Sequence, residues 1–120
     1  MLSAFGRREE ALAQAEEAVR IYRQLAQKRP DAFAADLARS IAVRGQIVAE
    51  DQPDIALEGF GEAIRLLTPA FSRFPQAHAG LMQAICGLYV RTAQAAGVDL
   101  DEGIFRPVVA VFERLTASSG

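Results

Sequence analysis

The chain repeats a helical pattern about every 45 residues, and this feature restricts its fold more than any other. The first copy spans residues 6–19 and begins Gly-Arg-Arg-Glu-Glu-Ala-Leu. The second copy combines residues 54–57 with 62–64, and the third combines 102–104 with 110–111. Such a period is typical of solenoids, in which each helix pair buries its apolar face only against its neighbours. The sequence therefore predicts an all-α solenoid of antiparallel helix pairs.

Apolar residues at steps of three and four predict about five helices. We expect them at residues 7–29, 31–50, 53–75, 76–96 and 99–115, with a frayed tail over 116–120. Proline and glycine mark the junctions, because proline cannot continue a helix and glycine favours its C-terminal end. The chain then divides into the second helix of an incomplete first unit (1–30), a second unit (31–75) and a degenerate third unit (76–116).

Some positions inside these helices break the simple pattern. Pro69 predicts a kink or break near residues 66–68, and Pro107 predicts an irregularity early in the last helix. Gly45 and the pair Gly59 and Gly61 predict close approach of neighbouring helices. Residues 108–112 are β-prone, so a strand is the alternative there, although the surrounding pattern favours a helix.

Composition excludes several classes of protein. Apolar residues make up 51% of the 120, too many for an intrinsically disordered chain. The 13 basic and 15 acidic residues are interleaved, so no face can neutralise a row of phosphates, and we expect no nucleic-acid partner. No run of about 20 apolar residues or signal peptide is present, and a single cysteine cannot form an internal disulfide. We expect a soluble cytoplasmic protein without a membrane partner.

The sequence offers no catalytic constellation. Cys86 and His78 are the only residues that suggest a nucleophile and its base. They are eight residues apart on one predicted helix, which places them about 12 Å apart along its axis. One His and one Cys cannot hold zinc, and the acidic run at 99–103 lacks the remaining ligands of a calcium loop. Gly59-Phe-Gly61 lacks the third glycine of a dinucleotide motif. We therefore expect no enzymatic activity, no metal and no cofactor.

The repeated pattern resembles the turn and second helix of a tetratricopeptide repeat. That family has a glycine at the turn and small or aromatic residues at set positions in the next helix. The matching positions are Gly6, Ala11, Ala15 and Ala18 in the first copy, Ala56, Phe60 and Ala63 in the second, and Gly103 and Ala110 in the third. The long period is similar to repeats of kinesin-light-chain type, abundant in actinobacterial multidomain proteins. The resemblance implies a right-handed superhelix whose groove binds a peptide or another protein.

In such a superhelix the second and fourth helices should line the groove. The groove candidates are Asp36, Arg39, Arg44, Gln46, Gln83, Tyr89 and Arg91. Arg39, Arg44 and Arg91 could make this groove favourable to anions, and the alternative is that all of them are ordinary solvated positions. Relatives that clamp a peptide carboxylate use Lys and Asn, whereas this chain has no Asn and a single Lys, Lys28. A receptor for chaperone tails is therefore not expected.

The terminal helices should expose apolar surface. The first helix would lack its preceding partner, and the last is apolar on two sides. Either the chain is a segment of a longer protein or it forms a homo-oligomer through these helices; alternatively, the end helices cover themselves. The candidates for self-association are Leu12, Val19, Tyr22, Phe105, Val109 and Phe112.

These observations lead to one expected function and two alternatives. We expect a protein–protein interaction scaffold, bacterial and cytoplasmic, that is a module of a larger regulatory protein. The first alternative is a sensor domain with a deep pocket lined by Arg44, Met82 and Tyr89 for a small molecule or peptide. The second alternative is a structural oligomerisation unit.

Overall fold

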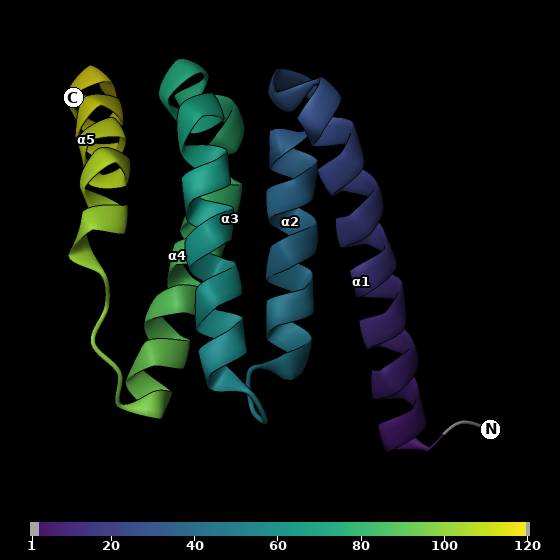
Figure 1. Cartoon of the computed structure of the whole chain (residues 1–120). Helices are drawn as coiled ribbons and strands as arrows, with labels where there is room; N and C mark the ends of the chain where they lie inside the picture. The colour runs from purple at the N-terminus through teal and green to yellow at the C-terminus, as the bar shows by residue number, and fades with distance from the viewer. Residues whose placement is uncertain (1–2, 120) are drawn as a thin grey trace.

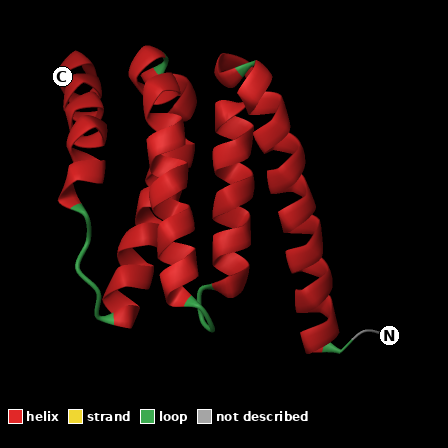
Figure 2. Cartoon of the chain, viewed as in Figure 1, coloured by secondary structure: helices red, strands yellow, loops and turns green. Residues whose placement is uncertain are grey.

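A computed structural model describes residues 3–119, which form five α-helices and no strand (Figures 1 and 2). The helices are α1 (Ala4–Lys28), α2 (Pro30–Val48), α3 (Pro53–Arg73), α4 (Pro75–Ala96) and α5 (Glu102–Ser119). Consecutive helices pack against each other, and α5 packs on both α3 and α4. Since α2 and α4 begin 45 residues apart, the fold is the all-α helical repeat that the sequence predicted.

Three of the junctions use the same local chemistry. Pro30, Pro53 and Pro75 each occupy the first position of a helix, where the missing N–H costs nothing because that donor has no helical partner. Pro30 therefore begins α2, and Asp31 lies in the first turn of that helix. Gly97 ends α4 in the left-handed conformation, at φ 68°.

The first and last helices differ from their predicted bounds. Ser3 caps α1, its Oγ accepting a hydrogen bond from the Gly6 N–H at 3.1 Å, so the helix starts three residues before Arg7. At α5 the carboxylate of Asp101 accepts from the Gly103 N–H at 3.0 Å, and the helix starts only at Glu102. The helix continues to Ser119, so residues 116–119 do not form the expected frayed tail. Residue 120 lies outside the described residues.

The prolines inside helices do not interrupt them. α3 is continuous through Pro69, and α5 is continuous through Pro107. In the turn before Pro69, the Thr68 hydroxyl donates to the Ile64 carbonyl at 2.6 Å. Leu67 and Phe71, on either side of Pro69, are fully buried, and this packing stabilises the helix. The predicted break near residues 66–68 was therefore wrong, and the β-prone segment 108–112 is helical.

The core is centred on α3, whose side chains Phe60, Ile64, Leu67 and Phe71 have no exposed surface. Glycines let the neighbouring helices approach it. A Cβ added at Gly45 of α2 would lie 2.6 Å from Cε1 of Phe60, and one at Gly59 would lie 3.4 Å from Ile41. A Cβ at Gly61 would lie 3.3 Å from Ile104 of α5. The predicted close approach at these glycines is confirmed.

Candidate functional site

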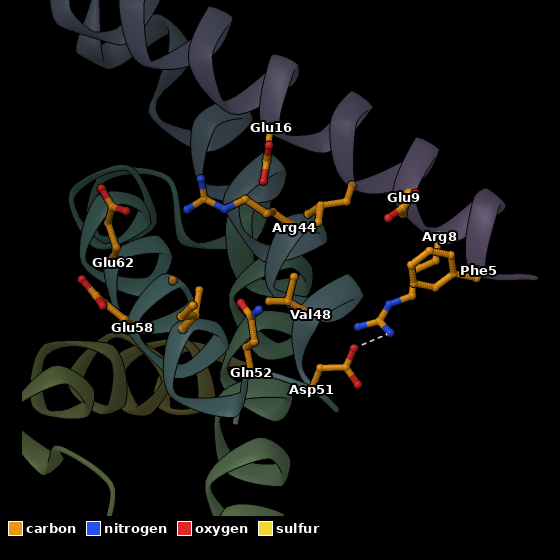
Figure 3. A pocket seen from close by; sticks show the side chains of 13 residues that line it. Phe5, Arg8, Glu9, Glu16, Arg44, Val48, Asp51, Gln52, Glu58 and Glu62 are labelled. Atoms are coloured by element: carbon orange, nitrogen blue, oxygen red, sulfur yellow. Dashed lines mark ion pairs between the residues drawn. The ribbon is translucent and has the colours of Figure 1, made fainter.

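A hollow lies between α1 and α3, with α2 as its floor (Figure 3). No Cα atom of α1 comes within 8 Å of a Cα atom of α3, so the two helices stand apart on either side of α2. Figure 1 shows α1 inclined to α2 and furthest from it at the N-terminal end of α1. The resulting pocket has a volume of about 510 Å³. We call it the α1–α3 groove; it is lined by Phe5, Arg8, Glu9, Leu12, Glu16, Arg44, Val48, Asp51, Gln52, Ile55, Glu58, Gly59 and Glu62.

Apolar side chains make up part of the base of the α1–α3 groove, beside Arg44 of α2 (Figure 3). Val48 of α2 belongs to the hydrophobic core, and Leu12 of α1 packs against that core. Phe5 and Ile55 stand at the mouth, 69% and 49% exposed. Exposed aromatic and aliphatic side chains next to a concave surface are typical of a binding site, because an occupant removes their surface from water. The lining of the groove thus includes both apolar residues of the core and two large apolar side chains that are exposed.

Charged side chains form its walls. Five carboxylates and two guanidinium groups line the α1–α3 groove, which gives it a formal charge of −3 at neutral pH. In Figure 3, Glu58 and Glu62 on α3 face Phe5, Arg8 and Glu9 on α1 across the pocket. The walls are therefore acidic on both sides of an apolar base.

One arginine closes the lower end of this pocket. The Nη1 of Arg8 lies 2.5 Å from the Asp51 carboxylate, and its Nε donates to the carbonyl of Ile47 at 3.2 Å (Figure 3). Arg8 thereby connects α1 to the C-terminal end of α2 and to the turn that follows. This ion pair neutralises one of the five carboxylates.

A second ion pair joins α1 directly to α3. Arg23 donates from Nη1 and Nη2 to the two carboxylate oxygens of Glu62, at 2.8 and 3.3 Å. The hydrogen bond from Arg23 lowers the pKa of Glu62, against the opposing effect of burial, and the charges of Arg44 and Arg65 lower it further. The two side chains are 41% and 35% exposed, so water screens the interaction. The pair links the two helices that form the groove walls.

Replacing Glu62 by Gln is expected to lower the free energy of unfolding by at most about 1 kcal/mol at pH 7, after allowance for solvent screening. The folded-state pKa of Glu62 is depressed, so its stabilisation is fully present above the unfolded pKa of about 4.3 and is lost as pH falls through the lower folded pKa. Urea unfolding of wild type and Glu62→Gln at pH 7 and at pH 3 measures this difference. A difference that is unchanged at pH 3 would contradict an ionic origin. Glu17→Gln, which breaks the exposed Arg20–Glu17 pair within α1, is the control and should have the smaller effect.

The structure distributes the predicted groove residues over several surfaces. Arg39 is ion-paired with Asp36 at 3.1 Å, and Gln46 and Gln83 are exposed and line none of the pockets described here. Arg91 lines a separate pocket of about 260 Å³, beside Glu50 and Pro53. Of the predicted set, Arg44 alone lines the α1–α3 groove.

Two of these placements correct the sequence-based interpretation. Tyr89 is only 7% exposed and packs against Phe105, with ring centroids 5.5 Å apart, so its ring belongs to the core. Arg39, Arg44 and Arg91 do not share a pocket, and the expected anion-favouring groove is not assembled. The physical reason for the second point is the turn of α2: Arg39 and Arg44 are five residues apart and point in different directions from the helix axis.

The residues predicted for self-association are largely covered within the chain. Val19 is a core residue with 4% exposure, and Tyr22 packs on Phe33 of α2. Phe105 packs on Tyr89, and Phe112 packs on Phe71 with ring centroids 4.8 Å apart. Leu12 lines the α1–α3 groove, and Val109 is 48% exposed. Most of the six predicted side chains are thus covered within the chain, while Phe5, Ile21 and Leu25 of α1 and Val109 of α5 stay exposed.

The cysteine and the histidine that the sequence singles out lie apart from the α1–α3 groove. Burial raises the pKa of the Cys86 thiol to about 11, so the thiol stays protonated at neutral pH and is a poor nucleophile. His78 lines a different pocket, together with Pro30 and Phe74. Over residues 3–119, no three His, Cys, Asp or Glu side chains are grouped as metal ligands, and no helix is both long and apolar enough to span a bilayer.

The sequence-based interpretation missed most of the groove lining. Phe5, Glu9, Leu12 and Glu16 recur at steps of three and four, and so do Ile55, Glu58 and Glu62. Each set lies on one face of its helix. A mixed apolar and acidic stripe repeated on both helices is the signal that could have found the site.

Comparison of the chain with protein-family models, with curated proteins and with solved structures finds no match.

Proposed function

We propose that the chain is a protein–protein interaction module that holds its partner in the α1–α3 groove. The observation that supports this most strongly is the open pocket of about 510 Å³ with Phe5 and Ile55 exposed at its mouth. Its repeat pattern and helix stacking support a scaffold of the tetratricopeptide kind. On this proposal the chain acts in the bacterial cytoplasm as part of a larger regulatory protein, a setting that fits its single reduced cysteine.

The geometry favours a scaffold over a small-molecule sensor. A sensor pocket was expected around Met82 and Tyr89, but Met82 has no exposed surface and Tyr89 is 7% exposed. The α1–α3 groove is instead a partly open hollow between two helices, with charged walls on both sides. Such a surface suits a polypeptide, which can contact the apolar base and the polar rim simultaneously. A structural oligomerisation unit is less favoured, because Val19, Tyr22, Phe105 and Phe112, four of the six side chains expected to mediate it, pack within the chain.

Exchange of Ile55 for Gln is expected to weaken partner binding about fivefold or more, because the exposed half of this side chain would lose its apolar contacts with the partner. Tagged wild-type chain and Ile55→Gln are used to isolate partners from bacterial extract, with quantification by mass spectrometry. Val98→Gln is the matched control, since Val98 is a 51% exposed aliphatic residue outside the groove. The direct affinity of each purified partner for the three proteins is then measured by calorimetry.

Two outcomes separate this proposal from its alternatives. A protein that binds wild type and Val98→Gln equally, and Ile55→Gln more weakly, supports the groove as the binding surface. Equal binding to all three proteins would contradict it. Because both substitutions lie on exposed positions, the three proteins should have melting temperatures within a few degrees of each other, about what 0.5 kcal/mol produces.

A further inference from the structure

We infer that the occupant of the α1–α3 groove is an amphipathic helix of another protein, with an apolar stripe flanked by Lys or Arg. This inference rests on the proposed function and specifies the partner's chemistry. Three properties of the groove support it: its length along α1 and α3, its few hydrogen-bond partners for a peptide backbone, and the arrangement of its charges.

The dimensions of the groove match a short stretch of helix. Its lining extends over residues 5–16 of α1 and 55–62 of α3. At 1.5 Å per residue these segments run for about 16 and 10 Å, which corresponds to two to three helical turns. α1 and α3 form two walls with α2 beneath them, and the walls diverge toward the N-terminal end of α1 (Figure 1). A third helix laid between two such walls can place residues i, i+3 or i+4, and i+7 on the base.

The walls offer little to an extended peptide. An extended chain needs partners for its backbone N–H and C=O groups, and helices have already satisfied their own backbone groups internally. Among the groove side chains, Gln52 is the only one that can both donate to and accept from a peptide backbone. A helical occupant satisfies its own backbone, so it needs only side-chain contacts. The groove therefore favours a helix over a strand.

The charges of the groove favour an occupant with positively charged side chains. Of the five wall carboxylates, Asp51 is paired with Arg8 and Glu62 with Arg23. Glu9, Glu16 and Glu58 form no ion pair within 4.0 Å in the described part of the chain. They stand on both walls, at 9 and 16 on α1 and at 58 on α3. Lysine or arginine on each flank of an apolar stripe would meet them, whereas an acidic helix would be repelled.

Arg44 does not reverse this preference. It lines the groove from α2, and its charge helps to lower the pKa of Glu62. Its guanidinium thus acts on carboxylates that belong to the same pocket. The groove retains a formal charge of −3 with Arg44 and Arg8 included.

The test uses three synthetic peptides of about 18 residues, the length of five helical turns. The first has Leu at heptad positions a and d, Lys at e and g, and Ala elsewhere. The second has Glu in place of Lys, and the third has the composition of the first in scrambled order. Fluorescence anisotropy with the full chain at low and physiological salt gives the three affinities. We expect the Lys peptide to bind at least about tenfold more tightly than either of the others, and more weakly as salt rises.

Reversing the charge of wall residues tests whether the peptide binds in the α1–α3 groove. The double substitution Glu16→Lys with Glu58→Lys is expected to lower the affinity for the Lys peptide about tenfold or more and to raise the affinity for the Glu peptide. Glu113→Lys with Glu102→Lys makes the same change of net charge on α5, outside the groove, and should alter both affinities less than about twofold. Circular dichroism checks that each variant keeps the helical content of wild type.

Several outcomes would overturn the inference. These are equal affinity for the Lys and Glu peptides, equal affinity for the Lys and scrambled peptides, no binding of any peptide, and an unchanged affinity in the wall variant. A dimer that is lost on Ile55→Gln, seen by light scattering, would assign the groove to a second copy of this chain instead. If the peptides fail but Ile55→Gln still releases a cellular partner that Val98→Gln retains, the proposed function stands and only the basic helix is excluded.

Discussion

Substitution of Phe60 by Ala is expected to lower the free energy of unfolding by about 3–5 kcal/mol, the cost of an uncollapsed cavity in a core. Phe60 has no exposed surface, lies at the middle of the central helix, and rests against Gly45 of α2. A domain of this size has a total stability of about 5–15 kcal/mol, so this single change removes a large share of it. Urea unfolding followed by circular dichroism measures the loss.

Phe74→Ala is the matched control for this substitution. The same atoms are removed, but Phe74 is 60% exposed in the turn between α3 and α4. The guanidinium of Arg73 lies 5.8 Å from its ring centroid, a contact worth about 0.5–1 kcal/mol at an exposed site. If Phe60→Ala cost no more than Phe74→Ala, the placement of Phe60 at the α2–α3 contact would be wrong.

Exchange of Gly45 for Ala is expected to destabilise the fold by up to about 2 kcal/mol, although alanine is the better helix former. The added Cβ would lie 2.6 Å from Cε1 of Phe60, and overpacking of this kind costs about 1–3 kcal/mol, against a gain of about 1 kcal/mol from helix propensity. Gly80→Ala is the control, because a Cβ there meets no atom within 4 Å. That substitution should stabilise α4 by about 0.5–1 kcal/mol.

A double-mutant cycle makes this prediction sharper. In the Phe60→Ala background, the ring that a Cβ at position 45 would meet is absent, so Gly45→Ala should become neutral or stabilising. The two substitutions are thus expected to be strongly non-additive. Additive losses would mean that Gly45 matters for its backbone freedom and not for the approach of Phe60.

The sequence predicted the architecture because its determinants are local. The stripe of apolar residues, the prolines at 30, 53 and 75, and Gly97 each act within one turn of helix, and the three junctions that the prolines mark fall within two residues of their predicted places. Gly45, Gly59 and Gly61 also indicated close helix contacts, since a glycine inside a helix is costly unless it allows such a contact. Most of the fold could therefore be predicted from local features of the sequence.

The features that the sequence did not predict depend on packing between helices. Pro69 has the local chemistry of a helix breaker, yet buried Leu67 and Phe71 keep α3 continuous around it. The candidate site depends on packing as well, because the stripes on α1 and α3 form one groove only where the two helices stand apart on either side of α2. Tyr89 was assigned to a groove by its position in the repeat, but contact with Phe105 places it in the core. Side chains on a repeat scaffold thus need the stacking angles before they can be assigned to a surface.

The way α1 is attached has a consequence for local stability. Only Ala15 and Val19 of α1 are buried, and α2 is the only helix that α1 packs against closely, whereas α3 buries eight residues among three neighbours. Opening of α1 therefore exposes less apolar surface than opening of any inner helix, and its amides should exchange with solvent at a lower free-energy cost. One wall of the α1–α3 groove stands on this helix. A ligand that bridges Ile55 and Leu12 would hold α1 closed and slow its amide exchange, so occupancy of the groove and the folding of its wall are thermodynamically linked.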